Sequence, residues 1–176
     1  MKPAAALVSV LLILAFGASA IRARAADDLG ARVDIVALRH SEAALRATYA
    51  SDKTMNLPRL LLFDGDGKPL LIEFGMRDGV GRRLAKALEK AKPLSSPVTL
   101  AMVLGEVVDA NGIAVASADL PRADGYVVDY WASWCTPCHL LARDIEGQLR
   151  RWDGRHIVWL KIESDPEQLP KEEIKG

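Results

Sequence analysis

The sequence predicts a sheet domain of the α/β or α+β class. Short apolar segments of strand length alternate with segments whose apolar residues recur at helical spacing. Half of the 176 residues are apolar and 26% are charged, a composition typical of globular proteins rather than disordered or collagenous ones. The 23 basic residues balance the 23 acidic ones. Because phosphate binding needs a clustered basic surface, this balance argues against nucleic acid as a partner.

The first 25 residues predict a secretory signal peptide. A basic start at Lys2 precedes an apolar stretch over residues 4–20, and small-residue cleavage sites follow at residues 18–20 and 23–25. The alternative is an uncleaved anchor, although this stretch only approaches the roughly 20 residues needed to span a bilayer. We therefore expect an exported protein, periplasmic or otherwise extracytoplasmic, that meets the membrane only if this segment is not cleaved.

Residues 93–97 combine two prolines with two serines and are interpreted as a linker. We expect the segments on either side, residues 26–92 and 98–176, to be two halves of one domain covering residues 26–176. The patterns of the first half predict a strand over 33–38, a helix capped by Ser41, a hairpin of strands 60–63 and 70–74, and an amphipathic helix over 80–91.

The second half contains a further hairpin signal, Asn111-Gly112, between apolar segments at 98–108 and 113–115. The remaining patterns predict a strand over 126–131, a helix over 137–152, a strand over 156–162 and a frayed polar end from Asp165. The strand over 126–131 is apolar except for Asp129.

The two cysteines, Cys135 and Cys138, are spaced C-x-x-C at the start of a predicted helix. A disulfide that closes so short a loop stabilises a fold by only about 2 kcal/mol, which is a weak reason for a structural bond. Helix N-terminal amides stabilise a thiolate, and Pro137 suits the first helical turn. We therefore expect Cys135 to attack and Cys138, in the same turn, to resolve the mixed disulfide.

The segment 128–138, Val-Asp-Tyr-Trp-Ala-Ser-Trp-Cys-Thr-Pro-Cys, resembles the active-site segment of the thioredoxin superfamily. The resemblance implies a thioredoxin-like fold with a central mixed sheet flanked by helices. It also implies disulfide exchange with protein thiols and disulfides, served by a redox partner protein and no cofactor. Cys135 takes the nucleophile position, Cys138 the resolving position and Trp134 the neighbouring aromatic position. Asp129 takes the position of a buried acid that assists deprotonation of the resolving cysteine.

Physical chemistry favours the same role for Asp129. A lone carboxylate in an apolar strand is costly to bury in its ionised form, so its pKa should rise and make it a usable proton acceptor. The alternative is an aspartate at an exposed position of the sheet.

The parts of this family occur here in an unusual order. A thioredoxin continues after the strand matching 156–162 with a helix, a cis-proline, a hairpin and a final helix, and these parts resemble residues 57–91. Pro58 takes the cis-proline position, and Arg59 replaces the family's usual small polar residue. The alternative for Pro58 is a trans proline that opens an edge strand. We therefore expect a circularly permuted domain, with two packed modules as the alternative.

The branch of the superfamily and the direction of the redox reaction are predicted only from smaller features of the sequence. The hairpin around Asn111-Gly112 resembles the exported TlpA/ResA-like reductases, whereas Asp129 is closer to thioredoxin proper. Thr136-Pro137 between the cysteines resembles the reducing members, so we expect a reductase.

Two other interpretations of the cysteines remain open. Cys135-x-x-Cys138-His139 matches the attachment signal for c-type haem, for which Met55, Met76 or Met102 would supply the second axial ligand. The aromatic-rich strand upstream, which haem attachment does not require, favours disulfide exchange. The third interpretation is a copper or zinc site made of the two cysteines with His139, His40 or His156.

Overall fold

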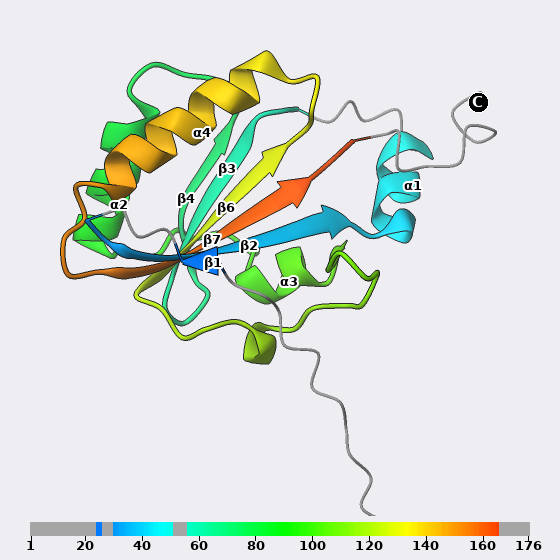
Figure 1. Ribbon diagram of the computed structural model, residues 1–176, viewed down its shortest axis with the longest axis horizontal. Helices are drawn as coiled ribbons and strands as arrows, with labels where there is room; N and C mark the ends of the chain where they lie inside the picture. Colours follow the sequence, from blue (N-terminus) through cyan, green and yellow to red (C-terminus); the bar gives the residue numbers. More distant parts are fainter. Residues whose placement is uncertain (1–23, 26–29, 51–55, 166–176) are drawn as a thin grey trace, which may run out of the picture.

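The computed structural model describes residues 24–25, 30–50 and 56–165 (Figure 1). Most of the predicted signal segment, Met55 and the polar end after Asp165 lie outside these residues. Within the described ranges, no helix combines the length and the apolar character needed to cross a bilayer.

One mixed sheet organises the described chain, with its strands in the order β1-β2-β7-β6-β3-β4 and β5 paired to the end of β2. β2, β7 and β6 run parallel, whereas β3 is antiparallel to β6 and β4 is antiparallel to β3. The predicted mixed sheet is therefore confirmed. The strands are β1 (Arg24–Ala25), β2 (Arg32–His40), β3 (Arg59–Asp64), β4 (Pro69–Phe74), β5 (Val107–Val108), β6 (Gly125–Trp131) and β7 (His156–Glu163).

Helices cover both faces of the sheet (Figure 1). α2 and α4 lie side by side on one face, α3 and the short helix η1 lie on the other, and α1 follows β2 at the edge. The helices are α1 (Glu42–Ala50), α2 (Val80–Lys90), α3 (Leu100–Leu104), η1 (Ser117–Asp119) and α4 (Thr136–Leu149).

The core therefore has two layers, and β6 contributes to both because successive strand residues point to opposite faces. Val127 packs in the layer that contains Ile145 of α4. Val128 packs in the layer that contains Val103 of α3. Below, the two surfaces are called the α4 face and the α3 face of the sheet.

Most of the predicted elements are confirmed. The five predicted strands at 33–38, 60–63, 70–74, 126–131 and 156–162 fall within β2, β3, β4, β6 and β7. The helix predicted over 80–91 is α2, and Ser41 caps α1, since its Oγ accepts a hydrogen bond from the Ala44 amide at 3.2 Å.

Two predictions are corrected. Residues 98–108 do not form one long strand, because Thr99 caps the short helix α3 and accepts a hydrogen bond from the Met102 amide. Only β5 is extended, and it pairs with β2 while Val108 makes a single bridge to Ala114. The helix predicted over 137–152 ends earlier, at Leu149, although Trp152 beyond it is still buried.

Both halves of the chain supply strands to the one sheet. β6 lies between β7 of its own half and β3 of the other half, so both of its edges are paired. Residues 93–97 form neither helix nor strand, and the Leu94 amide donates to the Pro69 carbonyl at 2.7 Å.

Candidate functional site

The two cysteines form a disulfide at the N-terminus of α4. Their Cα atoms are 5.3 Å apart, as i, i+3 spacing within one helical turn allows. Cys135 is the N-cap residue, and its Sγ accepts a hydrogen bond from the Cys138 amide at 3.2 Å. Pro137 lies in the first turn, where a helix does not use the missing N–H. After reduction, the same amide and the helix dipole would stabilise a thiolate on Cys135.

The two cysteines of the disulfide are buried, whereas the residue before them is exposed. Cys135 is 3% exposed and Cys138 is 1% exposed, whereas the adjacent Trp134 is 59% exposed. The loop before the helix is tied to the end of β7 by a hydrogen bond from Ser133 Oγ to the Asp165 carboxylate at 2.7 Å. This connection holds the Trp134 segment in place beside the disulfide.

Asp129 lies on the α4 face of β6 and is completely buried. Burial raises the pKa of its carboxyl to about 7, and the nearby charges of Lys161 and His139 only partly oppose this rise. Neither carboxyl oxygen has a hydrogen-bond partner among the described residues. The predicted burial and raised pKa are confirmed, and the alternative of an exposed position is wrong.

The Pro58 segment lies against the disulfide. The Leu57–Pro58 peptide bond is cis, and the Pro58 carbonyl accepts a hydrogen bond from the Gly75 amide at 2.8 Å. Leu57 packs against the cluster formed by Ala132 and the two cysteines. The fold thus brings residues 57–58 to a site that is almost 80 residues away in the sequence.

Sequence reasoning missed two cations near this site. Lys161 pairs in register with Asp129 across β6 and β7, and its Nζ lies 4.9 Å from the centre of the Trp159 ring. A lone lysine in an otherwise apolar strand was the available signal. Arg59 was noted only as an unusual residue after Pro58, and its guanidinium lies over the ring of Tyr130.

The ligands of the metal and haem interpretations are dispersed. His40 ends β2 and His156 begins β7, whereas His139 lies on α4 with its Nε2 at 3.2 Å from the Ser133 carbonyl oxygen. No group of three or more potential metal ligands of the Cys, His, Asp or Glu type occurs within the described segments. Met76 and Met102 are exposed side chains on separate elements.

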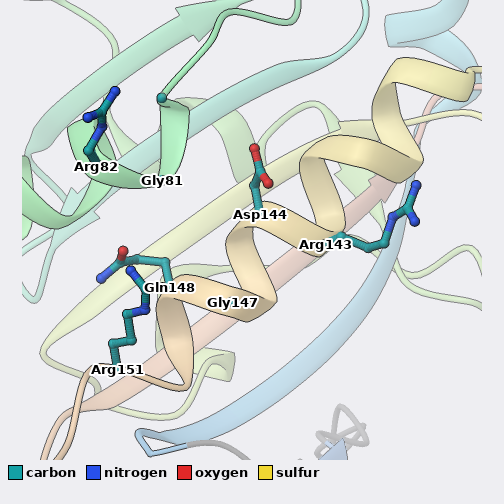
Figure 2. A pocket seen from close by; sticks show the side chains of 8 residues that line it. Gly81, Arg82, Arg143, Asp144, Gly147, Gln148 and Arg151 are labelled. Atoms are coloured by element: carbon teal, nitrogen blue, oxygen red, sulfur yellow. The ribbon is translucent and has the colours of Figure 1, made fainter.

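A separate cleft of about 340 Å³ lies between α2 and α4 (Figure 2). Gly81 and Gly147 leave space on the facing helices, and three arginines are among the lining residues. In Figure 2 the side chains of Arg82 and Arg143 point away from each other, so they do not converge on one ligand. The lining reaches Arg151, beyond the end of α4 opposite to the disulfide, so this cleft is not part of the cysteine site.

Comparisons with known proteins agree with this geometry. The chain is 37% identical over 60 residues to a thioredoxin of Pseudomonas aeruginosa, a match that covers 33% of this chain and 56% of the relative. It is 37% identical over 51 residues to a thioredoxin of Buchnera aphidicola, covering 28% of this chain and 47% of the relative. A thioredoxin of Staphylococcus saprophyticus is 35% identical over 49 residues, covering 27% and 47%.

The chain thus spans about half the length of the curated relatives it matches. No protein-family model matches it, and no solved structure gives a significant match. Together, the partial similarity to thioredoxins, the thioredoxin-like mixed sheet and the Cys135–Cys138 pair are features that this chain shares with the thioredoxin superfamily.

Proposed function

We propose that this protein is a thiol–disulfide oxidoreductase that acts on protein substrates, more specifically a reductase. The observation that carries the proposal is the disulfide at the N-terminus of α4, in which the Cys138 amide donates to Cys135 Sγ. A thiolate at this helix terminus has a lowered pKa and is therefore a competent nucleophile near neutral pH.

The reaction transfers two electrons to the substrate disulfide. The Cys135 thiolate attacks one substrate sulfur, forms a mixed disulfide and releases the first substrate thiolate. The Cys138 thiolate then attacks Cys135 Sγ, which releases the second substrate thiolate and leaves the Cys135–Cys138 disulfide. Asp129, which is buried and has its pKa raised to about 7, would accept the proton of the Cys138 thiol. A redox partner protein must then reduce the disulfide for the next cycle.

Exchange kinetics test the proposal directly. The reduced protein is mixed with a fluorescent peptide disulfide, and the second-order rate constant is compared with those of Cys135→Ser and Cys138→Ser. We expect Cys135→Ser to lose the reaction and Cys138→Ser to accumulate a mixed disulfide that mass spectrometry detects on Cys135. Reduced wild-type protein that reacts no faster than a free cysteine peptide would refute the function.

The redox direction is measured by the reduction potential of the cysteine pair. We expect a value near that of thioredoxin, about −270 mV, for a reductase. A value near −120 mV would instead assign the protein to the oxidants.

Disulfide exchange is preferred over haem attachment for a geometric reason. Cys138 is 1% exposed and lies in the first turn of α4, with its Sγ 4.0 Å from the Tyr130 carbonyl oxygen. Thioether bonds from both sulfurs would require a haem edge to reach this buried position. A purified protein with a Soret band would reverse the preference.

Export and a permuted chain order are further parts of the proposal. The composition of residues 1–25 supports a cleaved signal, which mass spectrometry of the protein isolated from the exporting cell tests at its N-terminus. The position of β6 between strands of both halves supports a permuted single domain over two modules. If residues 97–176 expressed alone gave a stable, active fragment, the permuted domain would be rejected.

A further inference from the structure

Arg59 is a cation without a charged partner in the described part of the chain. Its guanidinium carbon lies 4.9 Å from the centre of the Tyr130 ring and 5.3 Å from the centre of the Phe74 ring. The Nε atom is buried and makes no hydrogen bond there, and no carboxylate of those residues lies within 4 Å of the guanidinium. The two rings therefore hold the cation in place while its Nε donor has no partner among the described residues.

The backbone of Arg59 lies near the disulfide, whereas its side chain is on the α3 face of the sheet with Tyr130. Arg59 pairs directly with Tyr130 across β3 and β6, which places their Cα atoms about 5 Å apart. The carbonyl oxygen of Tyr130 is 4.0 Å from Cys138 Sγ. Leu57, two residues before Arg59, packs against the cysteine cluster. A polypeptide substrate that extends from the disulfide across this end of the sheet to the α3 face would therefore come within reach of the Arg59 side chain.

No described acidic group pairs with the charge of Arg59. Glu106 acts on the Tyr130 hydroxyl through space but forms no ion pair with Arg59. His40, on the same α3 face, lies with its ring centre 5.4 Å from that of Tyr130, and the charge of Arg59 disfavours its protonation. A half-buried cation in such surroundings gains from an incoming carboxylate, because a guanidinium binds a carboxylate through two parallel N–H donors.

The adjacent surface suits a polypeptide rather than a small anion. Phe74, whose ring lies beside Arg59, is 48% exposed, and Trp134, the residue before Cys135, is 59% exposed. Large exposed rings provide apolar contact area for a peptide.

We propose that Arg59 is a specificity-determining residue that binds a carboxylate side chain of the substrate, so that polypeptide disulfides with Asp or Glu beside the target cysteine react preferentially. This inference rests on the proposed exchange function and adds its substrate class. Arg59 takes no part in the bond changes, which remain the two sulfur exchanges at Cys135 and Cys138. It raises the rate by holding the acidic residue next to the attacking sulfur.

Peptide exchange kinetics test the preference. Three peptide disulfides differ only in the residue next to cysteine, which is Glu, Gln or Lys, and each reacts with reduced wild type, Arg59→Met and Arg59→Lys. For each protein, the rate constant with the Glu peptide is divided by the rate constant with the Lys peptide. The ratio for wild type is then divided by the ratio for Arg59→Met, so that the intrinsic reactivity of the peptides cancels. Arg151→Met is the matched control, since it removes an exposed arginine beyond the far end of the 14-residue α4, about 20 Å from the cysteines.

We expect the divided ratio to be about fivefold, as for one partly screened ion pair. Arg59→Lys should keep part of the preference, because it retains the charge without the planar donor pair. Arg151→Met should match wild type. High salt should reduce the preference of wild type itself, a readout that holds even if Arg59→Met fails to fold.

Equal ratios in wild type and Arg59→Met would overturn the inference while leaving the exchange function intact. A wild-type preference that does not respond to salt would also count against it. Absence of exchange with all three peptides would instead reject the proposed function itself.

Discussion

The two faces of the sheet differ in how burial shifts the pKa values of their polar groups, as the neighbouring β6 residues Asp129 and Tyr130 show. On the α4 face, Asp129 is fully buried and burial raises its pKa to about 7. On the α3 face, burial raises the pKa of Tyr130 to about 12 and lowers that of His40. All three side chains contain a polar atom that has no hydrogen-bond partner in the described chain.

The difference lies in which group changes charge near neutral pH. Asp129 alternates between its neutral and charged forms around pH 7, whereas Tyr130 remains neutral and His40 favours its neutral form. A buried acid and a buried base respond to pH with opposite signs. The α4 face can therefore serve proton transfer, while the α3 face supports the sheet and the Arg59 side chain.

The largest expected effect comes from Asp129→Asn. Folded Asp129 keeps its proton up to about pH 7 and the unfolded chain loses it near pH 4, so unfolding releases a proton between these values. Stability therefore falls as the pH rises through this window. Asp129→Asn has no carboxyl group to titrate and therefore does not lose this stability. The difference in free energy of unfolding, variant minus wild type, should increase by about 3 kcal/mol from pH 4 to pH 8. Urea denaturation at both pH values measures it.

Equal pH dependence in both proteins would mean that the pKa of Asp129 is the same in the folded protein as in the unfolded chain. The same variant should slow exchange at neutral pH with its fold intact. An unchanged pH–rate profile would remove Asp129 from the mechanism.

A paired carboxylate on the same α4 side should behave differently. Glu73 is buried, and Arg83 binds it through two nitrogens at 2.7 and 3.1 Å. Arg83→Met leaves this carboxylate without its partner and should lower the free energy of unfolding by about 2 kcal/mol. Arg82→Met, which removes an exposed neighbour that forms no ion pair with any described residue, is the control and should change the free energy of unfolding by less than about 0.5 kcal/mol. Equal effects would show that the pair contributes nothing.

On the α3 face, Tyr130→Phe should stabilise the protein. Its hydroxyl is buried without a partner among the residues that the structure describes, so removing it should raise the free energy of unfolding by about 1 kcal/mol with no pH dependence between pH 5 and 9. Tyr126→Phe is the matched control, because that hydroxyl donates to the Pro121 carbonyl at 3.1 Å and its loss should destabilise. If both variants were destabilised alike, the Tyr130 hydroxyl would have a partner.

The smallest effect is expected for His40. Its pKa is lowered mainly by burial, with a smaller contribution from Arg59, so unfolding binds a proton as the pH falls below the ordinary histidine value. Stability through His40 is therefore present above about pH 6.5 and is lost in acid. His40→Leu should flatten the stability curve below pH 6.5, opposite in sign to Asp129→Asn. A curve unchanged from wild type would place His40 in solvent-like surroundings.

The sequence predicted most of the fold because the patterns are local. Strand alternation and helical spacing located β2, β3, β4, β6, β7 and α2. It failed at residues 98–108, where four valines and a following Asn-Gly turn suggest a hairpin. There, Leu100, Val103 and Leu104 pack as a short helix against the α3 face, and this packing outweighs the strand preference of the segment.

The candidate site also has parts that the local sequence predicted and parts that it did not. Cys135, Pro137 and Cys138 lie within one helical turn, so their spacing alone predicted the disulfide and its place at a helix N-terminus. Lys161 and Arg59 were not predicted as neighbours of this site, because strands distant in the sequence bring them to it.

By itself, the sequence determined the reacting pair and the elements that hold it, since hydrogen bonding within a turn and apolar periodicity depend on residues a few positions apart. The tertiary structure decided which charges surround that pair. Only the pairing of β6 with β7 and β3 shields Asp129 from water, sets Lys161 beside it and lays Arg59 over Tyr130. The energy of a charge depends on the water and the dipoles around it, and these are fixed only when distant segments pack together.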